Sequence, residues 1–148
     1  MTYPDSDTRK FLAENVVAHK VCVDDEERLV TRYDVAWTPG LVWTTPAGEA
    51  VHTNVGYFDP TEFQAECSFA CGRVAAARGD WDRALERFDA TAERWPHSHA
   101  APAALFWAGA ASKRSTGEVD GLLDRWKRIL SDHAESAWAM KVSFVEED

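Results

Sequence analysis

The sequence has no long hydrophobic run. No apolar stretch approaches the roughly 20 residues that a membrane-spanning helix needs. The N-terminal residues also lack a basic region followed by an apolar one, which is the pattern of an export signal. We therefore expect a cytoplasmic protein with no membrane partner. Hydrophobic residues still make up 45% of the 148 residues, which is enough to bury one core or two small ones.

Positive charge is also scarce. Lys and Arg total 16 against 25 Asp and Glu, which gives a formal net charge of −9. The basic residues are scattered along the chain, whereas phosphate binding depends on clustered Lys and Arg. The composition therefore argues against nucleic acid and anionic membranes as partners.

Cysteine is rare, and its three positions favour packing over chemistry. Cys67 and Cys71 are four residues apart on a predicted helix and so share one face. Their Cα atoms would be about 6 Å apart, within disulfide range, but helical Cβ vectors run parallel rather than converging. We interpret both as small buried residues and keep a redox pair as the alternative. Cys22 lies in a predicted strand and is expected in the core.

Motifs for metals, cofactors and catalysis are missing too. His97 and His99 form the densest histidine pair, but no Cys or third His lies nearby in the sequence. His19, His52 and His133 are isolated, which is typical of surface or core positions. No Ser/His/Asp order, glycine-rich phosphate loop or paired-carboxylate motif is present. We therefore expect no metal site and no cofactor, and we assign no catalytic residue.

The most informative feature that is present is the tripeptide Trp37-Thr38-Pro39. It joins a predicted helix, Glu26 to Tyr33, to a predicted β-hairpin whose turn is Pro46-Ala47-Gly48-Glu49. An X-Pro bond at this junction is a candidate for the cis isomer. Before these elements the pattern predicts a helix from Asp5 to Asn15 and a strand from Val16 to Val23.

This order of elements, followed by a helix that opens after Gly56, resembles the C-terminal half of the thioredoxin fold. The resemblance covers Tyr3 to about Ala77. In that family a cis Thr-Pro lies beside the redox centre, and the residue before the proline offers its backbone to an extended peptide. The resemblance implies that Trp37, Thr38 and Pro39 bind substrate, with Trp37 as an exposed aromatic side chain. Gly40, where the family often has a bulkier residue, would leave room there.

Two features of the family are absent from the chain: its first strand and its Cys-x-x-Cys at the start of the first helix. That strand is central in the family, so the strand from Val16 to Val23 and the hairpin would flank a gap with unpaired backbone groups. Either the remaining strands pair directly or with a partner molecule, or Met1 is an internal methionine of a longer protein. We favour the longer protein, because the residues just after Met1 already resemble mid-helix sequence.

From Pro60 onward the pattern is helical. Helices are predicted from Thr61 to Arg78, from Trp81 to Trp95 with Asp80 as N-cap, and from Glu135 to about Phe144. Small and aromatic residues in the first pair resemble a tetratricopeptide unit: Gly72, Gly79, Trp81, Ala84, Phe88 and Pro96. A weaker version of this residue pattern recurs 37 to 38 residues later, at Gly109, Gly117, Leu123, Trp126 and Ala134.

The resulting prediction is an α/β protein with an incomplete thioredoxin-like sheet of about three strands, followed by an all-α tetratricopeptide-like extension. Residues 1–60 form the first part and residues 61–148 the second, with the helix at 61–78 shared. The function implied is that of a relative of thiol-disulfide oxidoreductases that is catalytically incompetent without Cys-x-x-Cys. The alternative is a non-catalytic module that binds a protein or peptide near Trp37 or along the repeats, or that forms homodimers through open sheet edges.

Overall fold

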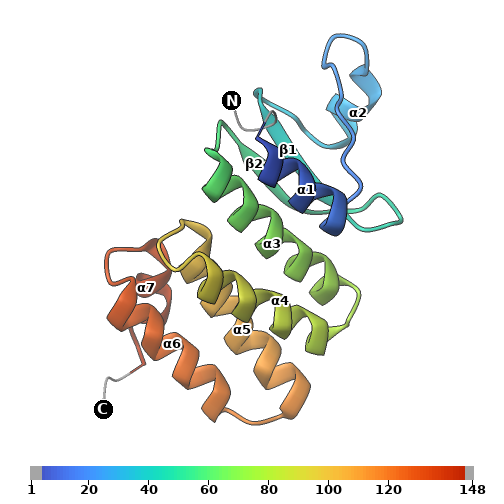
Figure 1. Cartoon of the computed structure of the whole chain (residues 1–148). Coiled ribbons are helices and arrows are strands. Elements are labelled where there is room, and N and C mark those ends of the chain that lie inside the picture. Colours follow the sequence, from blue (N-terminus) through green and yellow to red (C-terminus); the bar gives the residue numbers. More distant parts are fainter. Residues whose placement is uncertain (1–4, 146–148) are drawn as a thin grey trace.

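Strands are confined to the first half of the chain, and helices dominate the second (Figure 1). The structure, a computed structural model, describes residues 5–145. Its elements are α1 (Ser6–Asn15), α2 (Glu27–Arg32), β1 (Gly40–Thr44), β2 (Ala50–Val55), α3 (Pro60–Ala77), α4 (Trp81–Arg94), α5 (Ala100–Thr116), α6 (Asp120–Asp132) and α7 (Ala137–Val142). The predicted mixed α/β class is therefore confirmed for the described residues.

Aspartate side chains determine where three of the helices begin. Asp5 accepts a hydrogen bond from the Thr8 amide at 2.7 Å before α1. Asp59 accepts from two amides of the first turn of α3, and Asp80 accepts from the Arg83 amide in α4. These carboxylates satisfy amide groups that have no partner within the helix. The predicted cap at Asp80 is confirmed.

The hairpin forms where the sequence predicts it. β1 and β2 pair antiparallel, with Leu41 opposite Asn54 and Trp43 opposite His52. The Thr45 amide donates to the Glu49 carbonyl at 2.9 Å and closes the turn. Gly48 has a φ of +78°, a left-handed conformation that glycine adopts without steric cost.

The predicted strand from Val16 to Val23 is wrong. The described residues contain two strands rather than about three, and this segment belongs to neither. A strand requires a neighbour for its backbone hydrogen bonds, and no described strand pairs with the segment. Val17 is fully exposed, so the segment is not held by burial either.

The expected core position of Cys22 is also wrong. Cys22 is exposed, and its carbonyl accepts hydrogen bonds from the amides of Asp25 and Glu26 at 3.2 and 3.1 Å. These bonds form a turn that leads into α2. The apolar residues Val21 and Val23 around Cys22 suggested a buried strand, but the acidic run that follows favours a turn.

α3 is the helix on which the two halves of the molecule meet. It contacts α1 and both strands, and it also contacts α4 and α5. In Figure 1, α1, α2 and the hairpin lie on one side of α3, and α4 to α7 lie on the other. The helical side is held by fully buried side chains from successive helices, namely Phe88, Leu105, Ile129 and Val142. Burial of such a side chain stabilises the fold by about 1.5 to 3 kcal/mol.

Two glycines allow helices to approach closely. A Cβ atom at Gly72 of α3 would lie 2.5 Å from the ring of Phe88 in α4. A Cβ atom at Gly109 of α5 would lie 2.8 Å from the indole of Trp126 in α6. A glycine of one helix therefore lies against an aromatic ring of the next helix in both helical pairs.

The longest helix, α3, has 18 residues and carries charged side chains at Glu62, Glu66 and Arg73. None of the helices in the described range combines the length and the hydropathy that crossing a membrane requires.

Candidate functional site

The loop from Tyr33 to Pro39 is anchored at both ends. Asp34, with φ of +51°, ends α2, and the Val35 amide donates to the Val30 carbonyl at 3.0 Å. This is the hydrogen bond of a Schellman cap, in which a left-handed residue terminates the helix. At the other end the Gly56 amide donates to the Pro39 carbonyl at 2.8 Å, and the Thr38-Pro39 bond is cis, the isomer for which the sequence made it a candidate.

α2 is also tied to the turn of the hairpin. The guanidinium of Arg32 and the hydroxyl of Tyr33 each donate to the Gly48 carbonyl at 3.0 Å. The loop that carries Trp37 therefore starts and ends at fixed points, and its central residues are free to face solvent.

Trp37, Thr38 and Pro39 are all exposed. The Trp37 side chain is 71% exposed, which is unusual for a large aromatic residue. Val55 and Tyr57 are exposed at the same end of the hairpin, because Val55 pairs with Gly40. We call Trp37, Pro39, Val55 and Tyr57 the hairpin-end patch. A group of exposed apolar side chains is typical of an interaction surface, whereas single exposed apolar side chains are common on all protein surfaces.

β1 continues from this patch and has an open edge. The Gly56-to-Pro39 bond and the register together direct the backbone groups of Leu41 and Trp43 toward β2. The backbone groups of Gly40, Val42 and Thr44 then point the other way. Within residues 5–145 no hydrogen bond reaches these outward groups. An edge of this kind can pair with an additional strand.

Gly40 allows the loop to fold back against the start of β1. A Cβ atom at this position would lie 3.1 Å from the Trp37 carbonyl oxygen and 3.2 Å from Cγ1 of Val35. The space beside Gly40 is thus taken by the loop, and it is not the free room that the sequence suggests.

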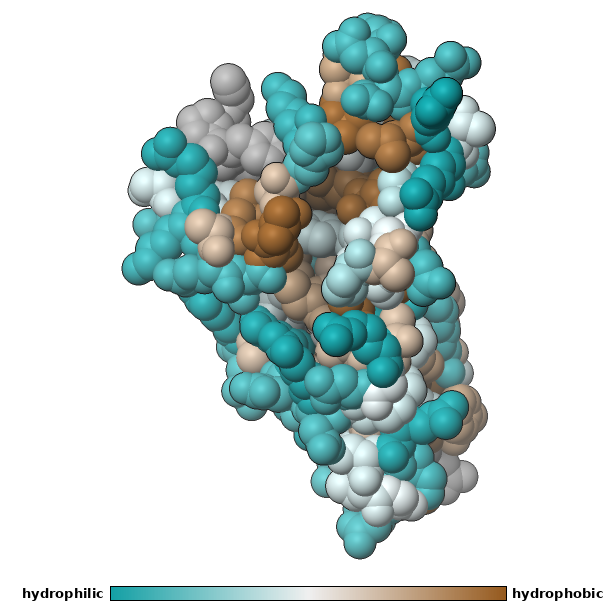
Figure 2. Space-filling view, turned by 90° about the vertical axis from the view of Figure 1, so that its right-hand side faces the viewer, coloured by the Kyte–Doolittle hydropathy of each residue, from teal (hydrophilic) through white to brown (hydrophobic). Residues whose placement is uncertain are grey.

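The surface around these elements is hollowed and apolar. Figure 2 shows hydrophobic side chains around a hollow in the upper part of the molecule, where α1, α2 and the hairpin lie in Figure 1. A hydrophobic recess of this kind can accept apolar side chains of a partner.

A partly buried polar network lies behind the hairpin. Oε1 of Glu66 in α3 is 2.5 Å from Nε2 of His52 and accepts from the Asn54 amide group at 2.9 Å. The indole of Trp43 donates to Oδ1 of Asn54 at 3.1 Å. The network fixes the face of the hairpin that packs on α3. Alternation places His52 and Asn54 on one strand face, but sequence reasoning treated His52 as isolated and missed its partner.

Cys67 and Cys71 lie on α3 near α1 and α4. Cys67 is buried and Cys71 half-buried, and both are free thiols. The Cys71 thiol donates to the Asn15 carbonyl at 4.0 Å. The neighbouring Cys67 thiol lowers the pKa of Cys71 to about 7, helped by the positive charges of Arg87 and Arg83 and opposed by burial. The Cys71 thiol and burial raise the pKa of Cys67.

A cavity of about 280 Å³ lies at the junction of α1, α3 and α4. Its lining includes the aromatic rings of Phe11 and Trp95 and the polar side chains of Asn15, Ser68 and Arg87. Arg87 donates to Oδ1 of Asn15 at 2.9 Å, which holds the end of α1 against α4. No group of three metal-ligating side chains occurs in residues 5–145.

Comparison with known proteins adds no assignment: no family model, curated protein or solved structure matches the chain. The features available for a functional argument are therefore the hairpin-end patch, the open edge of β1 and the thiol pair on α3. Trp37 and Pro39 belong to the hairpin-end patch, and the tripeptide Trp37-Thr38-Pro39 directly precedes the open edge of β1.

Proposed function

We propose that the chain is a thioredoxin-like protein, related to thiol-disulfide oxidoreductases, that binds an extended polypeptide without catalysing exchange. The order α1, α2, Thr38-Pro39, hairpin and α3 supports the fold assignment. The 148 residues contain no Cys-x-x-Cys, so the residues given lack the nucleophile that such catalysis requires. Fold analogy alone is a weak basis for function, so the binding role is argued from the surface.

We also propose that α3 to α6 form two tetratricopeptide-like pairs. The equivalent contacts of Gly72 with Phe88 and of Gly109 with Trp126 support this assignment. Such pairs rarely suffice for a stable solenoid, which usually needs three repeats. Packing of α3 against α1 and the hairpin would supply the missing neighbour.

The open edge of β1 beside the exposed Trp37 is the observation that carries the binding role. An extended peptide that pairs with Gly40, Val42 and Thr44 would satisfy their outward backbone groups. Its side chains would reach the hairpin-end patch, where Trp37 is the largest exposed ring. Buried aromatic anchors of this type dominate the energetics of many interfaces.

A second candidate uses the same edge for assembly. Two copies could pair through their open strand edges and form a homodimer without any foreign peptide. The molar mass in solution separates the two roles, because a peptide-binding chain is a monomer of 16.5 kDa and the dimer has twice that mass.

The test is a selection of peptides from a random 12-residue library on the immobilised chain, followed by affinity measurement for variants. Trp37→Ala should weaken binding of the selected peptides by about 2 kcal/mol, roughly thirtyfold, as expected for a central aromatic anchor. Phe144→Ala is the matched control, since Phe144 is equally exposed at 71% but lies near the other end of the chain.

Equal affinities of the Trp37→Ala variant and the parent chain would contradict the proposal. So would a selection in which Phe144→Ala, rather than Trp37→Ala, removes binding. A stable dimer that excludes all peptides would instead favour the assembly role.

A further inference from the structure

We propose that the cavity between α1, α3 and α4 binds a small monocarboxylic acid with an apolar body, in its ionised form. The cavity has a volume of about 280 Å³, just below the range of roughly 300 to 1,000 Å³ that is usual for small-molecule sites. The inference does not depend on the proposed function, because no residue that lines the cavity belongs to the hairpin-end patch or to β1. It rests on the charges, the aromatic rings and the space of the lining.

Two arginines of α4 border the cavity from one face of that helix. Arg87 and Arg94 are seven residues apart, which is about two helical turns, and Ala90 lies between them. Ala90 is exposed and carries a single methyl group, so it leaves space between the two long side chains. Two guanidinium-bearing side chains therefore border one opening.

Neutral groups hold both arginines in place. Nη1 of Arg87 donates to Oδ1 of Asn15 at 2.9 Å. The guanidinium of Arg94 lies over the rings of Trp95 and Phe11, at 4.7 and 5.7 Å from their centroids. Stacking of this kind restricts a guanidinium but leaves the N–H groups at its edge open to acceptors. Both cations are thus positioned by partners that do not neutralise them.

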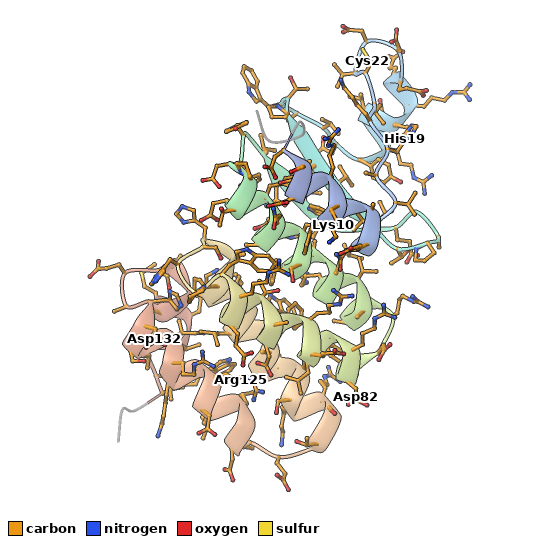
Figure 3. All side chains as sticks on the ribbon, viewed as in Figure 1. Lys10, His19, Cys22, Asp82, Arg125 and Asp132 are labelled. Atoms are coloured by element: carbon orange, nitrogen blue, oxygen red, sulfur yellow. The ribbon has the colours of Figure 1, made fainter. Side chains whose placement is uncertain are left out.

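Within residues 5–145, neither Arg87 nor Arg94 has a carboxylate oxygen within 4.0 Å. Arg125 of α6, labelled in Figure 3, is the contrasting case, because it pairs with Asp89 at 2.6 Å. Of the described residues that line the cavity, only Glu14 carries a carboxylate, and it is exposed in the last turn of α1. The lining therefore carries two positive charges and one negative charge. One carboxylate from a ligand would balance them, and its two oxygens match the paired N–H groups of arginine.

The buried hydroxyl of the lining acts as an acceptor. Thr91 donates its one hydroxyl hydrogen to the Arg87 carbonyl at 2.8 Å. Ser68, which is 4% exposed and lines the cavity, lies 2.8 Å from the Thr91 hydroxyl and must donate to it. Ser68 then has lone pairs but no hydrogen for a ligand. A bound carboxylate would accordingly take its hydrogen bonds from the two guanidinium groups.

The rest of the lining favours an acid with an apolar body over a bare oxyanion. Phe11 and Trp95 meet edge to face, with ring centroids 5.7 Å apart, and both are largely buried. Together with Ala90 they form an apolar wall beside the guanidinium groups. An inorganic phosphate would leave this wall in contact with water, whereas an apolar body would cover it.

The test uses the full chain and 3-phenylpropanoate, a carboxylate with a short apolar body. Proton–nitrogen NMR spectra follow the indole N–H of Trp95 and the side-chain amide of Asn15 during the titration. The matched ligand control is 3-phenylpropanamide, which has nearly the same shape but no charge. Inorganic phosphate is the second control, because it has the charge but no apolar body.

We expect 3-phenylpropanoate to bind saturably with a Kd of about 1 mM or lower, which is reasonable for a ligand of this size. The amide and phosphate should each bind at least about tenfold more weakly, because one lacks the charge-assisted hydrogen bonds and the other lacks the apolar contact. The largest changes in chemical shift should come from residues that line the cavity.

Variants of α4 test the two arginines and the space between them. Arg87→Gln and Arg94→Gln each remove one guanidinium and should weaken binding about tenfold. Arg83→Gln is the matched control, since Arg83 is an exposed arginine of the same helix that is not part of the lining. Ala90→Leu fills the space without removing a contact and should abolish binding. Leucine is nearly as good a helix former as alanine, so this variant should fold.

Equal binding of 3-phenylpropanoate and its amide would overturn the proposal, as would phosphate binding that is as tight as that of the acid. So would unchanged affinity in a folded Ala90→Leu variant, or the absence of saturable binding up to about 10 mM acid. The ligand comparison is made on the parent chain, so it decides the question even where an arginine variant does not fold.

Discussion

Glu66 joins the two halves of the molecule through a single carboxylate. It is 8% exposed and accepts contacts from His52 and Asn54 of β2, and Asn54 in turn accepts from the indole of Trp43. A buried acceptor that serves two donors is costly to remove, because both donors then lose their partner. Trp37 is the opposite case, since it is exposed and contributes little to the core.

Glu66→Ala should lower the free energy of unfolding by roughly 2 kcal/mol, since His52 and Asn54, which are half-buried, would lose their acceptor. Glu86→Ala is the matched control, because Glu86 is an exposed helical glutamate of α4 and its removal should change stability by less than about 0.5 kcal/mol. Urea unfolding of both variants measures the difference. Equal losses would show that the network does not hold the hairpin on α3.

At the scale of secondary-structure elements, the helices of each pair approach closely because the residue at the contact is a glycine, which has no side chain. Gly72 lies against Phe88, and Gly109 lies against Trp126 in the equivalent place of the next pair. The aromatic ring fills the space that a Cβ atom would take, so each glycine and its aromatic partner act as a unit. The salt bridge between Arg125 of α6 and Asp89 of α4, at 2.6 Å, adds a link between successive pairs.

Gly72→Ala should destabilise the chain by about 1 to 2 kcal/mol, although alanine is the better helix former by about 1 kcal/mol. The added methyl group would meet the Phe88 ring at 2.5 Å. The double variant with Gly72→Ala and Phe88→Leu should lose less free energy of unfolding than the sum of the losses of the two single variants. A double-mutant cycle therefore detects the contact. A stabilising Gly72→Ala would mean that the helices are farther apart.

Local signals explain which elements could be predicted from the sequence. Asp80 marks the start of α4, and Gly48 marks the hairpin turn, because caps and turns depend on residues close in sequence. The segment from Val16 to Val23 has strand-like residues, but a strand forms only beside a partner, which the sequence pattern does not supply. The Glu66 network was missed because it depends on the placement of α3 against β2.

The candidate site was predicted in part. The resemblance to the thioredoxin fold implies that Trp37 is exposed beside Thr38-Pro39, and Trp37 is 71% exposed. The spacing of four residues predicts that Cys67 and Cys71 share one face of α3, but it does not reveal the charges of Arg83 and Arg87 that α4 brings close to Cys71.

At the scale of the whole molecule, α3 separates two surfaces with different chemistry. The open edge of β1 and the hairpin-end patch lie on the side of the hairpin, and the thiol pair lies toward α4. The helices beyond α3 pack most of their aromatic residues against one another, many of them only partly buried. Their lower surface in the view of Figure 2 is mainly hydrophilic. The proposed binding of an extended partner therefore concerns the hairpin side of the molecule.

Hydrogen exchange of the β1 amides tests that claim most directly. In the free chain the outward amides of Gly40, Val42 and Thr44 should exchange quickly, while the amides of Leu41 and Trp43, which pair with β2, exchange slowly. Addition of a selected peptide should slow the outward amides at least about tenfold and leave Leu41 and Trp43 nearly unchanged. Outward amides that are equally slow in the free monomer, or that do not respond to a bound peptide, would contradict the account.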